Sequence, residues 1–232
     1  MISSEKAMQE LERLNTVAMN QTHNKTRSVI SCNIRSYRKH SEDLLTASTL
    51  EYADVICLQE TWLDPEEEVR EVKAMKQHNN SVGRGKGVMT LFKSNYCVVK
   101  DITKEKYQMT KLASETKEII NIYKSSDAKD EEFRDDLIEL INFNKETLVM
   151  GDFNICYINE RSNLIVKALE DVRFVQHVKF PTHIEGRLID HFYSFSPGTN
   201  RDYDVKQQAQ YFTDHDLIDI RQAEKGKLVF TY

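Results

Sequence analysis

Short runs of almost uninterrupted apolar residues recur along this chain, and they limit its fold more than any other feature. The segments SVISCNI, ADVICLQE, KEIINIYK and TLVMGDFN carry apolar residues at successive positions, where a strand with one solvated face would alternate. Strands of this kind are buried on both faces, so helices must cover the sheets that they form. The sequence therefore predicts an α/β fold, a four-layered sandwich of two packed mixed β-sheets flanked by helices.

Segments whose apolar residues have helical spacing lie between these strands. The clearest case is residues 127–144, where Phe133, Leu137, Leu140 and Ile141 share one face. Further helices are expected at residues 4–19, 40–52 and 161–172.

Glycine-rich turns and late apolar runs predict the remaining strands. Residues 83–93 and 96–101 have the pattern of two paired strands of a hairpin. Late strands are expected at 187–195, 215–222 and 226–232.

Composition narrows the class of protein. The 232 residues carry a net charge of -5, which argues against a generally basic coat for nucleic acid but leaves room for a local basic groove. The four cysteines are far apart and form no CxxC pair, so neither a disulfide framework nor a zinc site is expected. No apolar stretch approaches the ~18 residues of a membrane helix. We expect residues 1–27 to be a helix and linker and 28–232 a single domain, in an intracellular protein without membrane contact, with the nucleus favoured over the cytosol.

Polar side chains with useful chemistry follow nearly every apolar run. Functional groups of α/β proteins collect at strand ends, where the loops open. Within GDFN, Asp152 and Asn154 are two positions apart, so an extended backbone would point both side chains the same way. The full set of such residues is Asn33, Glu60, Tyr123, Asp152, Asn154, Asp190, Asp214 and His215.

These residue types indicate hydrolysis of a phosphate ester. Several carboxylates at close range repel one another and need a cation, and oxygen ligands favour Mg²⁺ or Mn²⁺ over zinc. Asparagines can donate hydrogen bonds to phosphate oxygens without adding charge. A histidine beside a carboxylate can be held as an imidazolium that stabilises a five-coordinate phosphorus, and an aspartate can accept a proton from water.

The motifs LQETW, GDFN, LIDH and TDHD, in this order, resemble the endonuclease/exonuclease/phosphatase superfamily over residues 28–232. Within it, NIRS, LQETWL, FPTHIEGRLIDHFYS and YFTDHDLI look most like endonucleases of mobile elements, of the LINE-type retrotransposons and the helicase-linked Helitron type. This resemblance implies a Mg²⁺-dependent DNA endonuclease that nicks one strand, leaving 3′-hydroxyl and 5′-phosphate ends. It also implies a monomer that was once fused to a reverse transcriptase or a helicase.

The resemblance implies roles for the metal-binding residues. Glu60 would be the main metal ligand, Asp214 a second or alternate ligand, and Asn33 would position the metal and the phosphate. Two positions depart from the family pattern: Thr213 replaces the usual serine, and Arg35 stands where abasic-site enzymes often carry an acidic residue. The second departure argues against the abasic-site subclass and assigns Arg35 to substrate binding instead.

The resemblance also implies the catalytic residues. Asp152 would orient or deprotonate the attacking water, and Asn154 would hold a phosphate oxygen. His215, paired with Asp190, would stabilise charge on the phosphorane, and Tyr123 would contact the scissile phosphate.

Three weaker features keep two interpretations each. His183 in PTHIEG would approach DNA as a substrate-binding residue or cap a turn. The basic clusters 35–40 and 84–86 would bind a phosphate backbone or be solvated loops. Trp62, by contrast, has a single interpretation and is expected in the core. For the whole chain, the alternatives are a phosphatase or sphingomyelinase-type phosphodiesterase of the same fold, or a DNA-binding remnant without catalysis.

Overall fold

Two six-stranded mixed sheets face each other in the computed structural model, which describes residues 28–223 apart from 47–49, 51, 68, 70, 71, 73, 199 and 200. The predicted helix at 4–19 and the predicted strand at 226–232 lie outside the described residues. The first sheet has the order β11-β12-β1-β2-β4-β3, with β11 (Tyr203–Gln208), β12 (Leu217–Gln222), β1 (Ser28–Asn33), β2 (Ala53–Gln59), β4 (Val88–Phe92) and β3 (Lys76–Asn80). The second has the order β5-β6-β7-β8-β10-β9, with β5 (Cys97–Thr103), β6 (Tyr107–Ala113), β7 (Lys117–Lys124), β8 (Glu146–Asp152), β10 (Asp190–Phe195) and β9 (Val175–Gln176).

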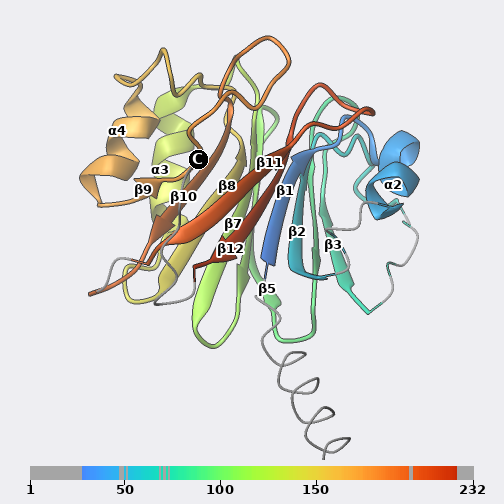
Figure 1. The fold of residues 1–232 in the computed structure, drawn as a ribbon, viewed down its shortest axis with the longest axis horizontal. Helices are drawn as coiled ribbons and strands as arrows, with labels where there is room; N and C mark the ends of the chain where they lie inside the picture. Colours follow the sequence, from blue (N-terminus) through green and yellow to red (C-terminus); the bar gives the residue numbers. More distant parts are fainter. Residues whose placement is uncertain are drawn as a thin grey trace, which may run out of the picture.

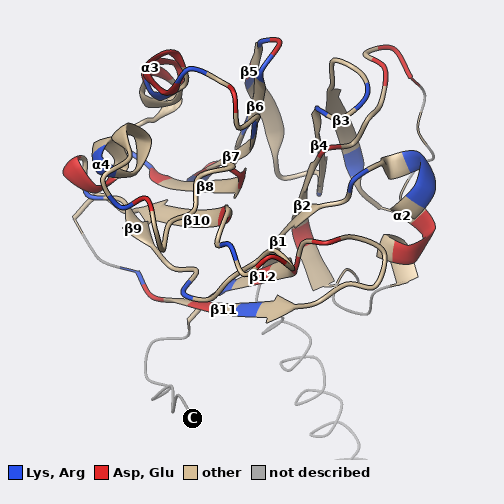
Figure 2. Ribbon diagram, turned by 90° about the horizontal axis from the view of Figure 1, so that it is seen from above, with Lys and Arg blue, Asp and Glu red and all other residues tan. Residues whose placement is uncertain are grey.

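Helices cover the outer faces of both sheets (Figures 1 and 2). Helix α2 (Tyr37–Thr46) lies beside the first sheet, and α3 (Asp130–Leu140) and α4 (Leu164–Asp171) lie against the second. The predicted four-layered α/β sandwich is therefore confirmed. No helix in the described part of the chain is long and apolar enough to cross a membrane.

Three apolar clusters fill the three spaces between the four layers, which explains the uninterrupted apolar runs. In β8, Leu148 and Met150 belong to the cluster between the sheets, whereas Val149 packs in the cluster with α3 and α4. In β1, Val29 lies between the sheets and Ile30 belongs to the cluster that includes residues of α2. Successive side chains thus enter different cores, and each needs to be apolar.

Strand register brings the polar strand ends to one edge of the sandwich. The two parallel pairs, β1 with β2 and β7 with β8, end together, so Tyr123 pairs with Asp152. In the antiparallel pair of β10 and β8, Asp190 lies directly opposite Asp152. Because paired positions point to the same face, all three side chains share the inner face of the second sheet, and Asp152 contacts Asn33 at the end of β1.

The predicted hairpin of residues 83–93 and 96–101 is wrong. Strand β4 pairs with β2 and β3 in the first sheet, whereas β5 pairs with β6 in the second. A turn closed by the Tyr96 amide donating to the Lys93 carbonyl at 3.1 Å separates the two strands, and the chain passes from one sheet to the other there. The glycine-rich segment instead joins β3 to β4, with Asn80 opposite Val88.

Candidate active site

Asn33 connects the two sheets at the centre of the site. Its amide nitrogen donates to Glu60 Oε1 at 3.1 Å and to Asp152 Oδ2 at 2.9 Å, and its oxygen accepts the Arg35 amide at 3.1 Å. The buried carboxamide thus holds a carboxylate from each sheet. In this arrangement it faces the carboxylates with its nitrogen, so its predicted contact to a metal stays a prediction.

Glu60 follows β2 in the left-handed backbone region, with a φ of 48°. Its second carboxylate oxygen, Oε2, accepts the indole N–H of Trp62 at 3.2 Å. Trp62 also has a positive φ, 57°, and is half-buried, so the expectation that it belongs to the core is wrong. The side chain reaches the surface beside the predicted metal ligand because the backbone turns twice within three residues.

The GDFN segment ends β8 in a sharp turn. Gly151 has a φ of 135°, and a Cβ there would lie 1.9 Å from the Ile122 carbonyl oxygen, so only glycine fits. Asp152 Oδ1 accepts the backbone N–H of Asn154 at 2.9 Å, and Asn154 has a φ of 51°. Asp152 and Asn154 therefore come together through a turn, and not through the extended strand that was expected. Asn154 Nδ2 lies 3.4 Å from Asp152 Oδ2 and 2.9 Å from the Lys124 carbonyl oxygen.

Burial changes the acidity of Asp152. It raises the pKa of the carboxyl to about 7, and the negative charge of Asp190 adds to the shift while the charge of His215 opposes it. Near neutral pH, the Asp152 carboxylate therefore accepts a proton far more readily than an ordinary aspartate does. This is the condition under which a carboxylate can both accept and release a proton.

His215 and Asp190 form a buried ion pair. His215 Nδ1 lies 2.8 Å from Asp190 Oδ2, and the Thr182 hydroxyl donates to the same oxygen at 2.7 Å. Burial alone would lower the pKa of His215, but the charge of Asp190 and the hydrogen bond to it outweigh burial and raise the pKa to about 9. The imidazole is therefore protonated at neutral pH.

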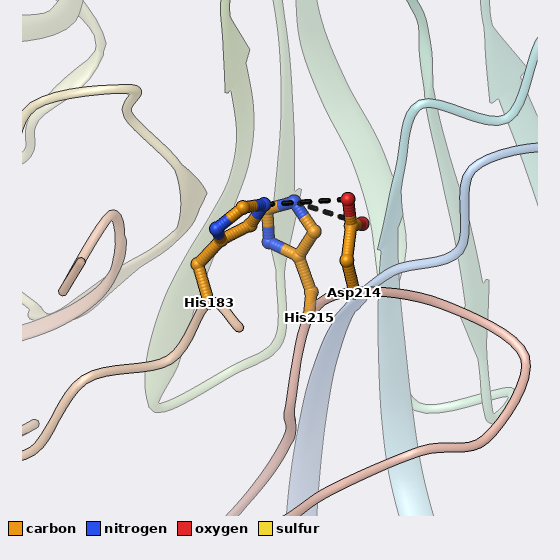
Figure 3. Close-up of side chains that lie close together, drawn as sticks. All are labelled: His183, Asp214 and His215. Carbon is orange, nitrogen blue, oxygen red and sulfur yellow. Dashed lines mark ion pairs between the residues drawn. The ribbon is translucent and has the colours of Figure 1, made fainter. Parts of the chain in front are cut away.

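Asp214 lies between three basic groups. It forms an ion pair with Arg35, and its Oδ2 is 3.3 Å from His183 Nε2. Its Oδ1 lies 3.8 Å from His215 Nε2, so both imidazoles face the carboxylate (Figure 3). Burial would raise the pKa of Asp214, yet the charges of His215 and Arg35 prevail and lower it.

His183 caps a turn, which is one of its two sequence interpretations, and its approach to DNA stays a prediction. Its Nδ1 accepts the backbone N–H of Glu185 at 3.2 Å, which caps the turn. This acceptor role leaves the proton of a neutral imidazole on Nε2, the nitrogen that faces Asp214. The ring also stands edge-on to His215, with the centroids 4.8 Å apart.

Tyr123 lies beside Asp152 but is turned toward a loop. Its hydroxyl donates to the Gly85 carbonyl at 3.0 Å, so it anchors the glycine-rich segment between β3 and β4. Burial and the nearby charges of Glu60 and Asp152 raise the pKa of the phenol, which stays a neutral donor. Contact with a scissile phosphate remains a prediction for this residue.

The donor set fits a hard divalent cation. Asn33 connects the carboxylates of Glu60 and Asp152, and Asp190 lies opposite Asp152. Asp190 Oδ1 and Asp214 Oδ1 are buried without a hydrogen bond from any described residue. Oxygen atoms left in this condition are unfavourable unless a cation or water meets them. Two groups, Asp152 with Asp190 and His215, and His183 with Asp214 and His215, each hold potential ligand atoms within 4.8 Å of one another. Glu60 belongs to neither group, and the protonated His215 cannot serve as a ligand, so the predicted role of Glu60 as the main metal ligand stays a prediction.

Two hydroxyl groups support the site: that of Thr182, which was not assigned from the sequence, and that of Thr213, which was expected to replace the usual serine of the family. Thr182 Oγ1 accepts the backbone N–H of Asp190 at 3.1 Å in addition to donating to its carboxylate. Thr213 donates to the Asn33 carbonyl at 2.9 Å, which joins the loop before β12 to the end of β1. Thr182 stands in the PTH motif, so the signal was present in the segment that singled out His183.

Two facing mixed sheets with carboxylates at their strand ends are the arrangement expected of a nuclease or phosphatase of this fold. A model of the endonuclease/exonuclease/phosphatase family matches residues 30–215, and the chain belongs to this family. The resemblance inferred from the motifs is thereby confirmed. No curated protein matches the sequence.

Solved structures share the fold at low sequence identity. An AP endonuclease from Archaeoglobus fulgidus superposes with a TM-score of 0.67 at 15% identity, covering 84% of this chain and 98% of that chain. The endonuclease domain of TRAS1, a telomere-specific non-LTR retrotransposon, gives 0.62 at 11%, covering 85% and 98%. The 3′ phosphatase NExo from Neisseria, bound to a product DNA hairpin, gives 0.61 at 14%, covering 85% and 99%.

Proposed function

We propose that this protein is a divalent-metal-dependent DNA endonuclease that nicks one strand and leaves 3′-hydroxyl and 5′-phosphate ends. The observation that carries the proposal is the contact of Asn33 with both Glu60 and Asp152, beside the ion pair of His215 and Asp190. A candidate base, a candidate cation site and a protonated imidazole thus occupy one edge of the sandwich. The similarity to an AP endonuclease and to a structure with bound DNA supports a DNA substrate.

Each group has a distinct part in this reaction. Asp152, with a pKa near neutrality, accepts the proton of the attacking water. The His215 imidazolium stabilises negative charge that develops on the phosphoryl oxygens, and Asp190 fixes its orientation. A Mg²⁺ or Mn²⁺ ion held by Glu60, and by Asp214 as a second ligand, would neutralise charge on the phosphate. Asn154 is placed to donate to a phosphate oxygen once its amide leaves the Lys124 carbonyl.

A mobile-element origin belongs to the same proposal. The fold similarity to the TRAS1 endonuclease domain supports it, and the nick would then start insertion of the element. A monomer acting in the nucleus is part of this hypothesis.

A plasmid-nicking assay tests the proposal. We expect conversion of supercoiled to open-circular DNA with Mg²⁺ or Mn²⁺ and none with EDTA, and we expect DNA ligase alone to reseal the product. Asp152→Asn and His215→Gln should each lower the nicking rate by about 100-fold or more. The matched variants Asp171→Asn, at the exposed end of α4, and His78→Gln, in β3, should keep the wild-type rate.

Three outcomes contradict the proposal. Nicking that persists at wild-type rate in both site variants would place catalysis elsewhere, provided that circular dichroism shows folded protein. Hydrolysis of an inositol phosphate or of sphingomyelin without DNA cleavage would assign the site to another phosphoester. DNA retention without turnover in either metal would indicate a binding remnant.

A further inference from the structure

A pocket of about 400 Å³ opens directly beside the candidate active site. It lies between the start of α2, the loop after β2 and the loop before β12. Its lining includes Arg35, Lys39, Trp62, Ile184, Tyr211 and Phe212, and it shares Asp214 with the site. A space of this size is within the ~300–1,000 Å³ of pockets that hold small organic groups.

Apolar exposure is concentrated at this pocket. Ile184 and Tyr211 are each 83% exposed, more than any other large hydrophobic side chain in the described part of the chain. Single exposed apolar residues are ordinary, but two that line one pocket mark a contact surface. The Tyr211 ring is also held in place, because its hydroxyl donates to Asp43 Oδ1 at 2.5 Å and the ring stands edge-on to Phe212.

Trp62 forms the wall nearest to the predicted metal ligand. Its positive φ is an unfavourable backbone conformation for so large a side chain. Such strained residues cluster at functional sites, where the backbone fixes the direction of a side chain. Lys39 Nζ lies 6.0 Å and Arg84 Cζ 5.7 Å from the ring centroid. Neither cation has an acidic partner among the described residues, so both can bind an anion.

We propose that this pocket binds the base of an unpaired DNA nucleotide next to the scissile phosphate, an inference that rests on the proposed function. Aromatic faces stack on bases of any sequence, and free cations beside them bind the adjoining phosphates. A regular duplex keeps its bases stacked inside, so only an unpaired or extruded base reaches such a pocket. The chain therefore prefers DNA with an unpaired nucleotide over continuous duplex.

A pocket that binds a base would distinguish this chain from enzymes that select a nucleotide without a base. If stacking holds the nucleotide, an abasic nucleotide at the same place must bind more weakly, because it offers no ring. Arg35, which stands where abasic-site enzymes often carry an acidic residue, lines this pocket and pairs with Asp214.

Binding in EDTA, measured by fluorescence anisotropy with the full chain, tests the inference without turnover. Three DNAs are compared: a duplex, the same duplex with one unpaired adenine nucleotide, and the same duplex with an abasic nucleotide in that position. We expect the unpaired adenine to bind about five- to a hundredfold more tightly than the other two, the range that stacking on an aromatic side chain supplies.

Variants locate this preference. Tyr211→Ala should remove most of the preference and Tyr211→Phe should keep most of it, because stacking needs the ring, whereas the hydroxyl only helps to hold the ring in place. Trp62→Leu and Trp62→Phe make the same comparison on the opposite wall. Phe143→Ala is the matched control, since Phe143 is 42% exposed and lies before the start of β8, away from the strand end that carries the site.

Equal binding of the three DNAs by the wild type would overturn the inference, and so would an unchanged preference in Tyr211→Ala and Trp62→Leu. If the wild type nicks plasmid but shows no preference, the proposed function stands and only the pocket assignment fails. If it neither binds nor nicks DNA, both fail.

Discussion

At the scale of single residues, the buried ion pair of His215 and Asp190 sets the protonation state of the imidazole. Asp190 supplies the charge and the hydrogen bond that raise the pKa of His215 to about 9 against the effect of burial. The pair stabilises the folded state while the imidazole is protonated. Since the pKa of an unfolded histidine is near 6.5, this contribution is complete below pH 6.5 and is lost as pH rises through about 9.

Asp190→Asn should therefore lower the pKa of His215 by at least about one unit, because the neutral amide removes the attraction. The measurement is an NMR titration of the imidazole in metal-free protein. Chemical denaturation should show a larger loss of stability for the variant at pH 6 than at pH 10. An unchanged His215 titration, or a loss that grows with pH, would contradict the assigned coupling.

Other residue-level features of the site lay beyond sequence reasoning. Arg35 and Asp214 are 179 positions apart, and nothing local indicates that they pair. The orientation of the Asn154 side chain depends on its left-handed backbone conformation, which cannot be predicted when the segment is taken as an extended strand. The strand-end residues could be assembled because parallel strands end together, but their individual partners depend on contacts across the two sheets.

At the scale of elements, a polar layer between the two sheets lies just below the site. The amide nitrogen of Asn121, in β7, donates to the Leu58 and Met89 carbonyls of the opposite sheet at 3.3 Å and 3.1 Å. Its oxygen accepts from Gln59 Nε2 at 2.7 Å. This layer fixes how β7 lies against β2 and β4, and hence how the two halves of the site meet.

Asn121→Leu should destabilise the fold by about 3 kcal/mol or more, because it leaves Gln59 and two carbonyls with fewer partners in a buried layer. Urea denaturation measures the change in the free energy of unfolding. Asn159→Leu, at an exposed position, should change it by less than about 0.5 kcal/mol. Equal stability of both variants would mean that the layer contributes nothing to docking of the sheets.

The sequence indicated the strands that are continuous apolar runs and not those with more polar residues. Strand β6 lies inside the second sheet and is buried, yet it was missed because polar residues interrupt its apolar positions, whereas β5 at the sheet edge was predicted. Strands β1, β2, β7 and β8 are buried along their length and read as apolar runs. Strands β3 and β11 stand at sheet edges, and their mostly polar, half-exposed sequences carry no such signal. The wrong hairpin has the same origin, because the sheet that a strand joins depends on distant partners and not on its own residues.

At the scale of the whole molecule, charge does not mark a nucleic-acid surface. The chain carries a net charge of -5, and basic and acidic residues are interspersed over the described ribbon (Figure 2). Under the proposed function, affinity for DNA would come from a few cations near the site, among them Lys39 and Arg84. Few phosphate contacts give a weak dependence of binding on salt.

Arg84→Gln should lower the slope of log K against log salt by about one, because each neutralised phosphate contributes about 0.9 to it. Lys167→Gln, on the exposed side of α4, should leave the slope unchanged. Both slopes come from anisotropy titrations at several salt concentrations. A steep slope that neither substitution alters would require a DNA contact surface elsewhere on the molecule.

The two hydrogen bonds of Asn33 make the geometry of the site depend on the alignment of the two sheets. One carboxamide spans the junction, with its partners Glu60 and Asp152 carried by different sheets. A slip of one strand position, about 3.3 Å, would exceed its reach. Any change that loosened the docking of the two sheets would therefore separate the two carboxylates, even if each sheet kept its own hydrogen bonds, and the proposed nicking activity would be lost with it.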